Sequence, residues 1–152
     1  MIKDSGKRVE FETGAVRDIG EGKGRCDLLP LYVISDLFDN EDVSELFKGM
    51  GVLEDRDVEP EVKYEIAKNI LKTYCKWMGL SIPQVVLDVS IHFEEGAKKY
   101  GEHNWEKGIP EWSYISSATR HLLKLLDGWE DEQHGRAFVW NILAYMYTIR
   151  VN

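Results

Sequence analysis

The chain has 152 residues and a mass of 17.6 kDa, with 43% hydrophobic and 30% charged residues. This length suits one domain with a buried core, and the composition excludes a disordered or fibrous chain. The formal net charge of -8 argues against binding to a nucleic-acid polymer. An anionic ligand such as a nucleotide would have to meet a local group of cations or a bound metal ion.

Neither end of the chain predicts a membrane segment. No apolar run approaches the ~18 residues of a membrane span, and the N-terminal region has no apolar core of a signal peptide. Cys26 and Cys75 lie far apart and form no CxxC motif, so we expect two reduced thiols rather than a zinc site or a disulfide. These features favour a cytoplasmic protein.

The first 30 residues predict an irregular arm, because closely spaced glycines disfavour a helix. These glycines are Gly6, Gly14, Gly20, Gly22 and Gly24. From Pro30 the apolar residues recur at helical spacing and predict a short helix to about residue 40. A second short helix is expected over 41–50, closed by Gly49 and Gly51.

Four longer helices are expected over about 62–79, 81–100, 110–127 and 131–150. Ser81 is the expected N-cap of the second of these, and Val62 and Val86 are placed on buried stripes. No strand pair is expected. The sequence therefore predicts one all-α domain over 1–152, an irregular arm over 1–30 and a four-helix-bundle core within about 59–150.

A histidine and two glutamates stand close together in the expected helix 81–100, at His92, Glu94 and Glu95. His92 and Glu95 are three residues apart, so they lie on neighbouring turns. Carboxylate oxygens are natural ligands of Mg²⁺ or Mn²⁺, which bind a few carboxylates together with phosphate and water. The same residues also fit a solvated helix face, and spacing alone leaves both interpretations open.

A second polar cluster marks the junction of the last two expected helices. It consists of Asp127, Glu130, Asp131, Glu132 and His134. If the last helix begins by Asp131, then Asp131, His134 and Asn141 project to nearly the same side. Stabilisation of a helix N-terminus also explains acidic residues here. Two acidic clusters on facing helices would repel each other without a cation, which favours a metal site between them.

The arm carries two cations among its glycines, Lys23 and Arg25, where the backbone allows a phosphate to approach. No Ser or Thr follows the lysine, so this is not a Walker A loop. A flexible basic loop and a triphosphate-contacting arm both remain open. His121, which follows Arg120, fits either a hydrogen-bonded core histidine or a group that contacts phosphate or supports a carboxylate.

Short motifs follow one another along the chain in a defined order. The N-terminal ones are Thr13–Asp18, Gly22–Arg25 and Asp27–Pro30. The later ones are His92–Ala97, Lys99–Gly101, Asn104–Pro110, Ser117–Ala118, Arg120–His121, Asp131–Glu132, His134 and Trp140–Asn141. In this order they resemble the phage dATP/dGTP diphosphohydrolase family, related to the MazZ enzymes. The resemblance extends over about residues 11–148 and is least diagnostic over about 40–80.

The resemblance implies a fold similar to the MazG-like pyrophosphohydrolases, with Mg²⁺, or alternatively Mn²⁺, held by helix carboxylates. Those relatives carry ExxE and ExxD motifs on facing helices, whereas this chain has His92-x-x-Glu95 and Asp131-x-x-His134. A homo-oligomer is also implied. In a phage that replaces adenine by diaminopurine, the product would serve modified-purine synthesis in the host cytoplasm.

We therefore expect an enzyme that converts dGTP, dATP or both to the monophosphate and pyrophosphate. The expected metal ligands are Glu94, Glu95, Asp131, His92 and His134. Glu94 and Glu95 are the expected catalytic residues, with Glu95 accepting the proton of the attacking water. The expected substrate-binding residues are Arg17, Lys23, Arg25, Asn104, Trp105, Lys107, Arg120, His121 and Asn141, with Trp105 or a neighbouring aromatic residue stacking on the base. The alternatives are a non-catalytic module that binds or sequesters nucleotide, and a helical interaction protein with a solvated acidic face.

Overall fold

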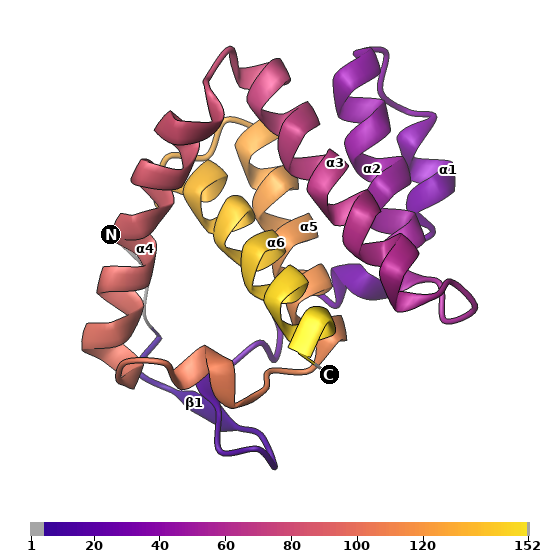
Figure 1. The fold of residues 1–152 in the computed structure, drawn as a ribbon. Coiled ribbons are helices and arrows are strands. Elements are labelled where there is room, and N and C mark those ends of the chain that lie inside the picture. Colours follow the sequence, from indigo (N-terminus) through magenta and orange to yellow (C-terminus); the bar gives the residue numbers. More distant parts are fainter. Residues whose placement is uncertain (1–4, 152) are drawn as a thin grey trace.

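The structure, a computed structural model, describes residues 5–151, and helices dominate it as the sequence predicts (Figure 1). The helices are α1 (Leu31–Ser35), α2 (Glu41–Glu54), α3 (Pro60–Met78), α4 (Ile82–Tyr100), α5 (Glu111–Leu126) and α6 (His134–Val151). Two 3-10 turns, η1 (Cys26–Leu28) and η2 (Asn104–Lys107), and two short strands, β1 (Arg8–Glu10) and β2 (Val16–Asp18), complete the elements.

Local signals set the ends of α3 and α4 where the sequence predicts them. Gly79 ends α3 in the left-handed conformation with φ of 68°, which costs a glycine little. Ser81 begins α4 with a capping box: its Oγ accepts from the Gln84 backbone N–H at 3.2 Å, and Gln84 Oε1 accepts from the Ser81 N–H at 2.8 Å.

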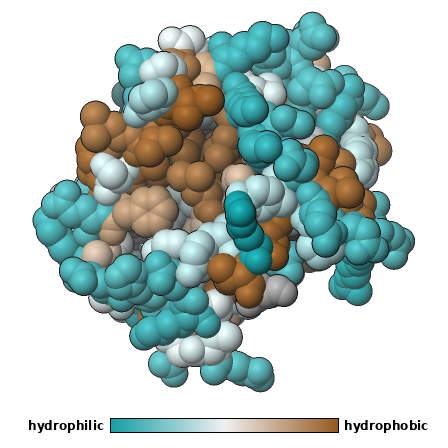
Figure 2. Space-filling view, in the orientation of Figure 1, coloured by the Kyte–Doolittle hydropathy of each residue, from teal (hydrophilic) through white to brown (hydrophobic). Residues whose placement is uncertain are grey.

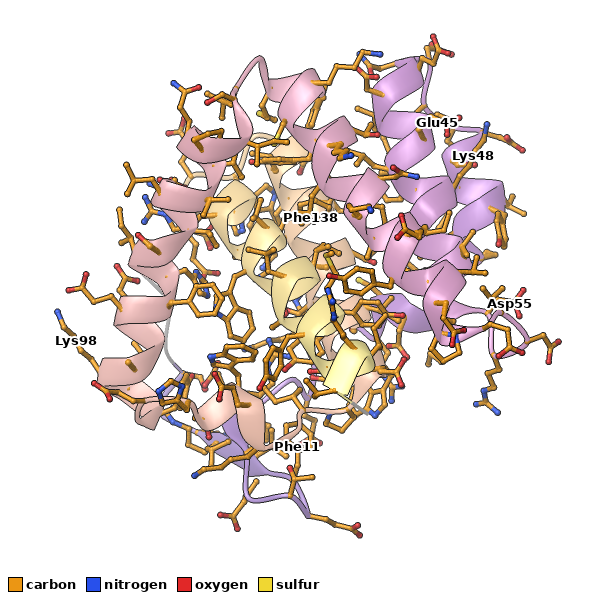
Figure 3. All side chains as sticks on the ribbon, viewed as in Figure 1. Phe11, Glu45, Lys48, Asp55, Lys98 and Phe138 are labelled. Atoms are coloured by element: carbon orange, nitrogen blue, oxygen red, sulfur yellow. The ribbon has the colours of Figure 1, made fainter. Side chains whose placement is uncertain are left out.

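Helix α6 lies at the centre of the bundle and packs against α3, α4 and α5 (Figure 1). Its apolar face carries Phe138, Ile142 and Tyr145, each at most 1% exposed. Figure 3 shows Phe138 among the helices, while the charged side chains that it labels point outward. The predicted bundle is therefore confirmed, with α2 as a further packed helix against α3 and α5.

Helix α2 does not close at Gly49 and Gly51 but continues to Glu54, so the predicted end at residue 50 is wrong. The two glycines serve packing instead of termination. A Cβ on Gly49 would lie 2.7 Å from Ile70 Cγ1, and one on Gly51 would lie 3.3 Å from the Tyr32 ring. Close approach of the buried Ile70 side chain thus requires glycine at position 49, whereas the half-exposed Tyr32 ring would have to shift only slightly for a side chain at position 51.

We expect Gly49→Ala to lower the free energy of unfolding by about 1–3 kcal/mol, because the added methyl group clashes with the buried Ile70 side chain. Gly96→Ala in α4 is the matched control, since its Cβ would meet nothing within 4 Å. The free energy of unfolding of that variant should rise by about 0.5–1 kcal/mol, the ordinary effect of replacing glycine by alanine in a helix. Denaturant unfolding of both variants measures the difference, and equal shifts would contradict the packing argument.

The N-terminal arm contains a strand pair, so the expectation of none is wrong. Strands β1 and β2 are antiparallel, with Val9 opposite Arg17. Each has only three residues, and Gly14, with φ of 86°, forms the turn between them. Strands this short leave too little alternation for a sequence pattern to show. The hairpin lies at the lower end of the bundle in Figure 1, close to η2.

Three further expectations differ from the structure. Helix α1 ends at Ser35 rather than near residue 40, and α6 begins at His134 rather than at Asp131. Val62 and Val86 are 49% and 51% exposed, because α3 and α4 turn these positions away from the core. Val86 belongs to an exposed apolar strip on α4, together with Ile82, Leu87 and Ile91. Figure 2 shows apolar surface over this part of the molecule.

Glu54 is a carboxylic acid with an unsatisfied buried oxygen at the C-terminal end of α2. Its Oε1 has no hydrogen-bond partner among the described residues. Burial, with a smaller contribution from the charge of Asp27, raises the pKa of Glu54 to about 8. The acid is therefore mostly protonated at neutral pH.

This raised pKa predicts a pH-dependent stability. Between pH 4.5 and about 8 the folded chain holds a proton that unfolded Glu54 has released, so the free energy of unfolding falls as pH rises through this range. Glu54→Gln removes this dependence, and above pH 8 it should be more stable than the parent by about 1–3 kcal/mol, allowing for partial exposure. Thermal unfolding of both proteins between pH 5 and 9 tests this, and parallel curves would contradict it.

Among residues 5–151, none of the helices combines the length and apolar character needed to cross a bilayer. Cys26 and Cys75 are both free thiols, as predicted, and Cys75 is buried.

Candidate functional site

A cavity of about 400 Å³ opens among α4, α5, α6, the hairpin and η2. This volume lies in the range of small-molecule sites. Eight of the residues predicted to form the site line the cavity: Arg17, Lys23, His92, Asn104, Trp105, Arg120, His121 and Asn141. The structure thus gathers side chains from both ends of the sequence into one place.

Arg17 projects from β2 into the cavity. Its Nη1 donates to Ser113 Oγ at 2.9 Å, and its Nη2 donates to Asn141 Oδ1 at 3.1 Å. Asn141 is itself oriented by the donation of its Nδ2 to the Ala137 carbonyl at 2.8 Å. Burial lowers the pKa of Arg17, and no carboxylate in residues 5–151 forms an ion pair with it. An enclosed guanidinium with unused donors suits an anionic ligand.

Asn104 in η2 holds the strand that carries Arg17. Its Oδ1 accepts from the Val16 N–H at 2.8 Å, and its Nδ2 donates to the Val16 carbonyl at 2.6 Å. Asn104 is only 5% exposed. This amide satisfies both backbone groups of Val16 in β2, so its main role is to fix the hairpin against the cavity.

Further cations surround the same part of the cavity. Arg120 Nη1 donates to the Gly24 carbonyl at 3.0 Å and so connects the arm to α5. Lys23 pairs with Asp18 at 2.6 Å, and Lys124 lies 4.8 Å from the Trp129 ring centroid. Burial lowers the pKa of Arg120. These side chains supply the local positive charge that an anion needs in this acidic protein.

Aromatic rings form another wall of the cavity. Phe93 lies 5.5 Å from the Trp105 centroid and 5.8 Å from that of Trp140, and the His92 ring lies 5.3 Å from Trp140. Burial lowers the pKa of His92 to about 4 despite the opposing charge of Glu95. At neutral pH this wall is therefore uncharged and suits a flat aromatic group such as a purine.

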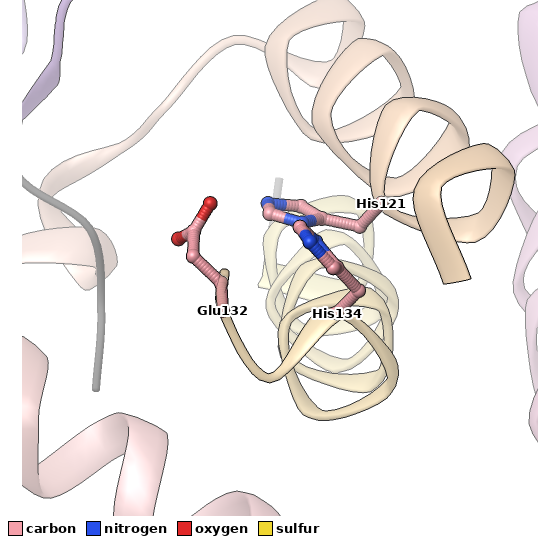
Figure 4. A group of neighbouring side chains, drawn as sticks. All are labelled: His121, Glu132 and His134. Carbon is pink, nitrogen blue, oxygen red and sulfur yellow. The ribbon is translucent and has the colours of Figure 1, made fainter. Parts of the chain in front are cut away.

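Two histidines and a glutamate meet at the end of the cavity formed by α5 and α6 (Figure 4). His121 Nδ1 and His134 Nδ1 lie 2.9 Å apart, and one ligand atom from each of the three side chains lies within 4.8 Å of the others. Burial and the neighbouring charge of Arg120 lower the pKa of His121 to about 2. His121 is thus neutral at physiological pH, as a metal-binding imidazole must be.

The structure also places predicted residues away from the cavity. Glu94 is exposed and pairs with Lys98 at 3.3 Å. Arg25 forms a two-pronged ion pair with Asp27 at 2.7–2.8 Å and stacks 4.0 Å from the Trp112 centroid.

Three more predicted residues do not line the cavity. Lys107 is exposed on η2, and Glu95 is half-buried close enough to His92 for its charge to act on the ring. Asp131 precedes α6, and its Oδ1 lies 2.7 Å from His134 Nε2. The predicted metal ligands Glu94 and Glu95 are therefore not brought together with His134 in a single cluster.

Sequence reasoning named Glu132 only as a neighbour of Asp131 and missed Lys124, Phe93 and Trp140 as lining residues. One signal was available. Polar residues recur on α5 at Ser117, Arg120, His121 and Lys124, the i, i+3, i+4, i+7 spacing of a single helix face. That polar face, opposite the apolar one, is the part of α5 that the cavity uses.

Comparison with known families bears on the same region. A family model described as "dATP/dGTP diphosphohydrolase, N-terminal" matches residues 66–151, more than half of the chain. The match includes α4, η2, α5 and α6, whereas the hairpin and the arm lie outside it. No curated protein and no solved structure gives a significant match. The relationship of this chain to the MazG-like enzymes remains a prediction.

Proposed function

The chain belongs to the dATP/dGTP diphosphohydrolase N-terminal family, and from this membership and its cavity we propose that it hydrolyses dATP or dGTP to the monophosphate and pyrophosphate. The observation that carries the proposal is the enclosed Arg17 in a cavity that also has an aromatic wall. A nucleotide needs both, because its phosphates seek cations and its base seeks an apolar surface.

The arrangement of the cavity supports one orientation of the substrate. The base lies against Phe93, Trp105 and Trp140. The triphosphate extends toward Arg17 and Arg120, whose remaining N–H groups donate to phosphate oxygens.

The proposed reaction is a displacement at the α-phosphorus. A water oxygen forms the new bond to this phosphorus, the bond to the oxygen bridging the α- and β-phosphorus atoms breaks, and pyrophosphate leaves. The proton of the water passes to a basic group. A divalent cation, Mg²⁺ or Mn²⁺ as in the family that the chain resembles, would neutralise phosphate charge and activate the water. Arg17 and Arg120 orient the phosphates for this in-line geometry.

The wider setting is also part of the proposal. A homo-oligomer would cover the exposed apolar strip on α4, and sedimentation of the purified protein measures this. The resemblance to the phage dATP/dGTP diphosphohydrolase family further suggests that the protein acts in the cytoplasm of a phage-infected cell, where its product would be used for modified-purine synthesis.

The test is to incubate the protein with each of the four dNTPs and either Mg²⁺ or Mn²⁺, and to separate the products. We expect dGTP, dATP or both to yield monophosphate and pyrophosphate in equal amounts. Stoichiometric retention of nucleotide without pyrophosphate would favour a sequestering module instead. An absence of any nucleotide-dependent thermal shift would favour a helical interaction protein.

A further inference from the structure

In the cluster of His121, Glu132 and His134, the two histidine nitrogens have the spacing of neighbouring ligands in one coordination sphere. Two nitrogens bound at about 2.1 Å in neighbouring octahedral positions lie about 3.0 Å apart, and the two Nδ1 atoms are 2.9 Å apart. Ligands on opposite sides of an ion lie about 4.2 Å apart. The three ligand atoms lie within 4.8 Å of one another, so the Glu132 carboxylate has to move toward the two histidines for all three to bind one ion.

Asp131 supplies a second and independent observation. Its Oδ1 lies 2.7 Å from His134 Nε2, the nitrogen on the other side of the ring from the cluster. A hydrogen bond from Nε2–H to this carboxylate leaves Nδ1 without a proton and directs its lone pair toward His121. Metal-binding histidines characteristically have such a carboxylate partner, which fixes the ring and raises its basicity.

The position of the cluster leaves part of a coordination sphere open. The side chain of His134 is fully buried, whereas His121 and Glu132 line the cavity beside Arg120 and Lys124. Three protein ligands with a free side toward a cavity are typical of a catalytic rather than a structural metal site. Figure 4 shows the Glu132 carboxylate across from the His121 ring, on the side away from α5.

We propose that His121, His134 and Glu132 form a binding site for one first-row transition-metal ion, with Asp131 positioning His134. Two imidazoles and one carboxylate suit Zn²⁺, Fe²⁺ or Co²⁺, and Mn²⁺ less tightly, whereas Mg²⁺ prefers oxygen ligands and water. The inference deepens the proposed function, on which its catalytic meaning rests. It places the ion at the α5–α6 end of the cavity rather than at Glu94 and Glu95.

The test is a Co²⁺ titration of the full chain, followed by the visible absorption of the bound ion. We expect one Co²⁺ per chain, displaced by equimolar Zn²⁺ but not by a large excess of Mg²⁺. Asp131→Asn should weaken binding about 10- to 100-fold. His121→Gln and Glu132→Gln should weaken it more, because each removes a ligand. Thermal unfolding of each variant confirms that it is folded, and both replaced side chains are partly exposed.

The double variant Glu94→Gln/Glu95→Gln is the matched control, and its Co²⁺ affinity should equal that of the parent. The proposal is overturned if the parent does not bind Co²⁺, if the His121 and Glu132 variants bind like the parent, or if the control loses binding. If the protein hydrolyses a dNTP with Mg²⁺ but does not bind Co²⁺, the metal site is refuted and the hydrolase proposal stands. If the protein binds Co²⁺ as expected but forms no pyrophosphate with any metal, the hydrolase proposal is refuted and the metal site stands.

Discussion

Arg17→Gln is expected to lower kcat/KM for the preferred dNTP about 100-fold. The guanidinium lies in the cavity with two of its five donors used, by Ser113 and Asn141, so the others are available to phosphate. Losing charge-assisted hydrogen bonds to phosphate costs about 2–3 kcal/mol of transition-state stabilisation. Steady-state pyrophosphate release measures the effect. The kcat/KM of Arg17→Lys should fall between those of the parent and Arg17→Gln, because lysine keeps the positive charge but lacks the paired N–H donors of the guanidinium.

Arg25→Gln is the matched control for Arg17. Both arginines belong to the N-terminal arm, but Arg25 pairs with Asp27 and stacks on Trp112 outside the cavity. Its replacement should change kcat/KM by less than about twofold, since an exposed ion pair contributes little. Equal losses in the Arg17 and Arg25 variants would show that the arm acts through its total charge, and would contradict the role given to Arg17.

Asn104→Ala is expected to lower kcat/KM about 30-fold through its effect on the hairpin. The side chain makes two hydrogen bonds to the Val16 backbone, and their loss costs roughly 2 kcal/mol. The hairpin, still held by Thr13 and by Arg17 itself, then becomes more mobile and Arg17 is less well positioned in the cavity. Hydrogen exchange provides the second measurement, because the Val16 amide should exchange faster in the variant.

The control for Asn104 is Lys107→Ala, on the same turn but exposed. It should change neither kcat/KM nor Val16 exchange by more than about twofold. Lost activity in Asn104→Ala with unchanged Val16 exchange would mean that Asn104 acts on substrate directly. That outcome would contradict a positioning role.

The family and the broad fold were predictable because both depend on local patterns. The motif order predicted the dATP/dGTP diphosphohydrolase family, which the family model confirms over residues 66–151. Helical periodicity predicted all of the long helices, and the Ser81 cap and the Gly79 end are confirmed. Errors arose where packing decided, as at Gly49, whose place in α2 depends on Ile70 of another helix.

The sequence predicted which residues belong to the candidate site better than it predicted how they are arranged. Polar residues among apolar ones stand out in a sequence, so most lining residues were named. The i,i+4 spacing of Glu94 and Lys98 on one helix was a local signal for their exposed ion pair. Spacing could not show that α6 begins only at His134. With that later start, Asp131 precedes the helix and contacts the His134 ring instead of sharing a helix face with it.

By itself, the sequence determined the long helices, the Gly79 end of α3, the Ser81 cap of α4 and the family, because these properties depend mostly on local patterns. It did not determine the ends of α1 and α2 or the start of α6. Only the tertiary structure decided which side chains meet. Arg17 reaches Ser113 and Asn141 across 96 and 124 residues, and His121 meets His134 across two helices. Such contacts depend on how helices pack, and packing is a property of the whole chain that no local spacing encodes.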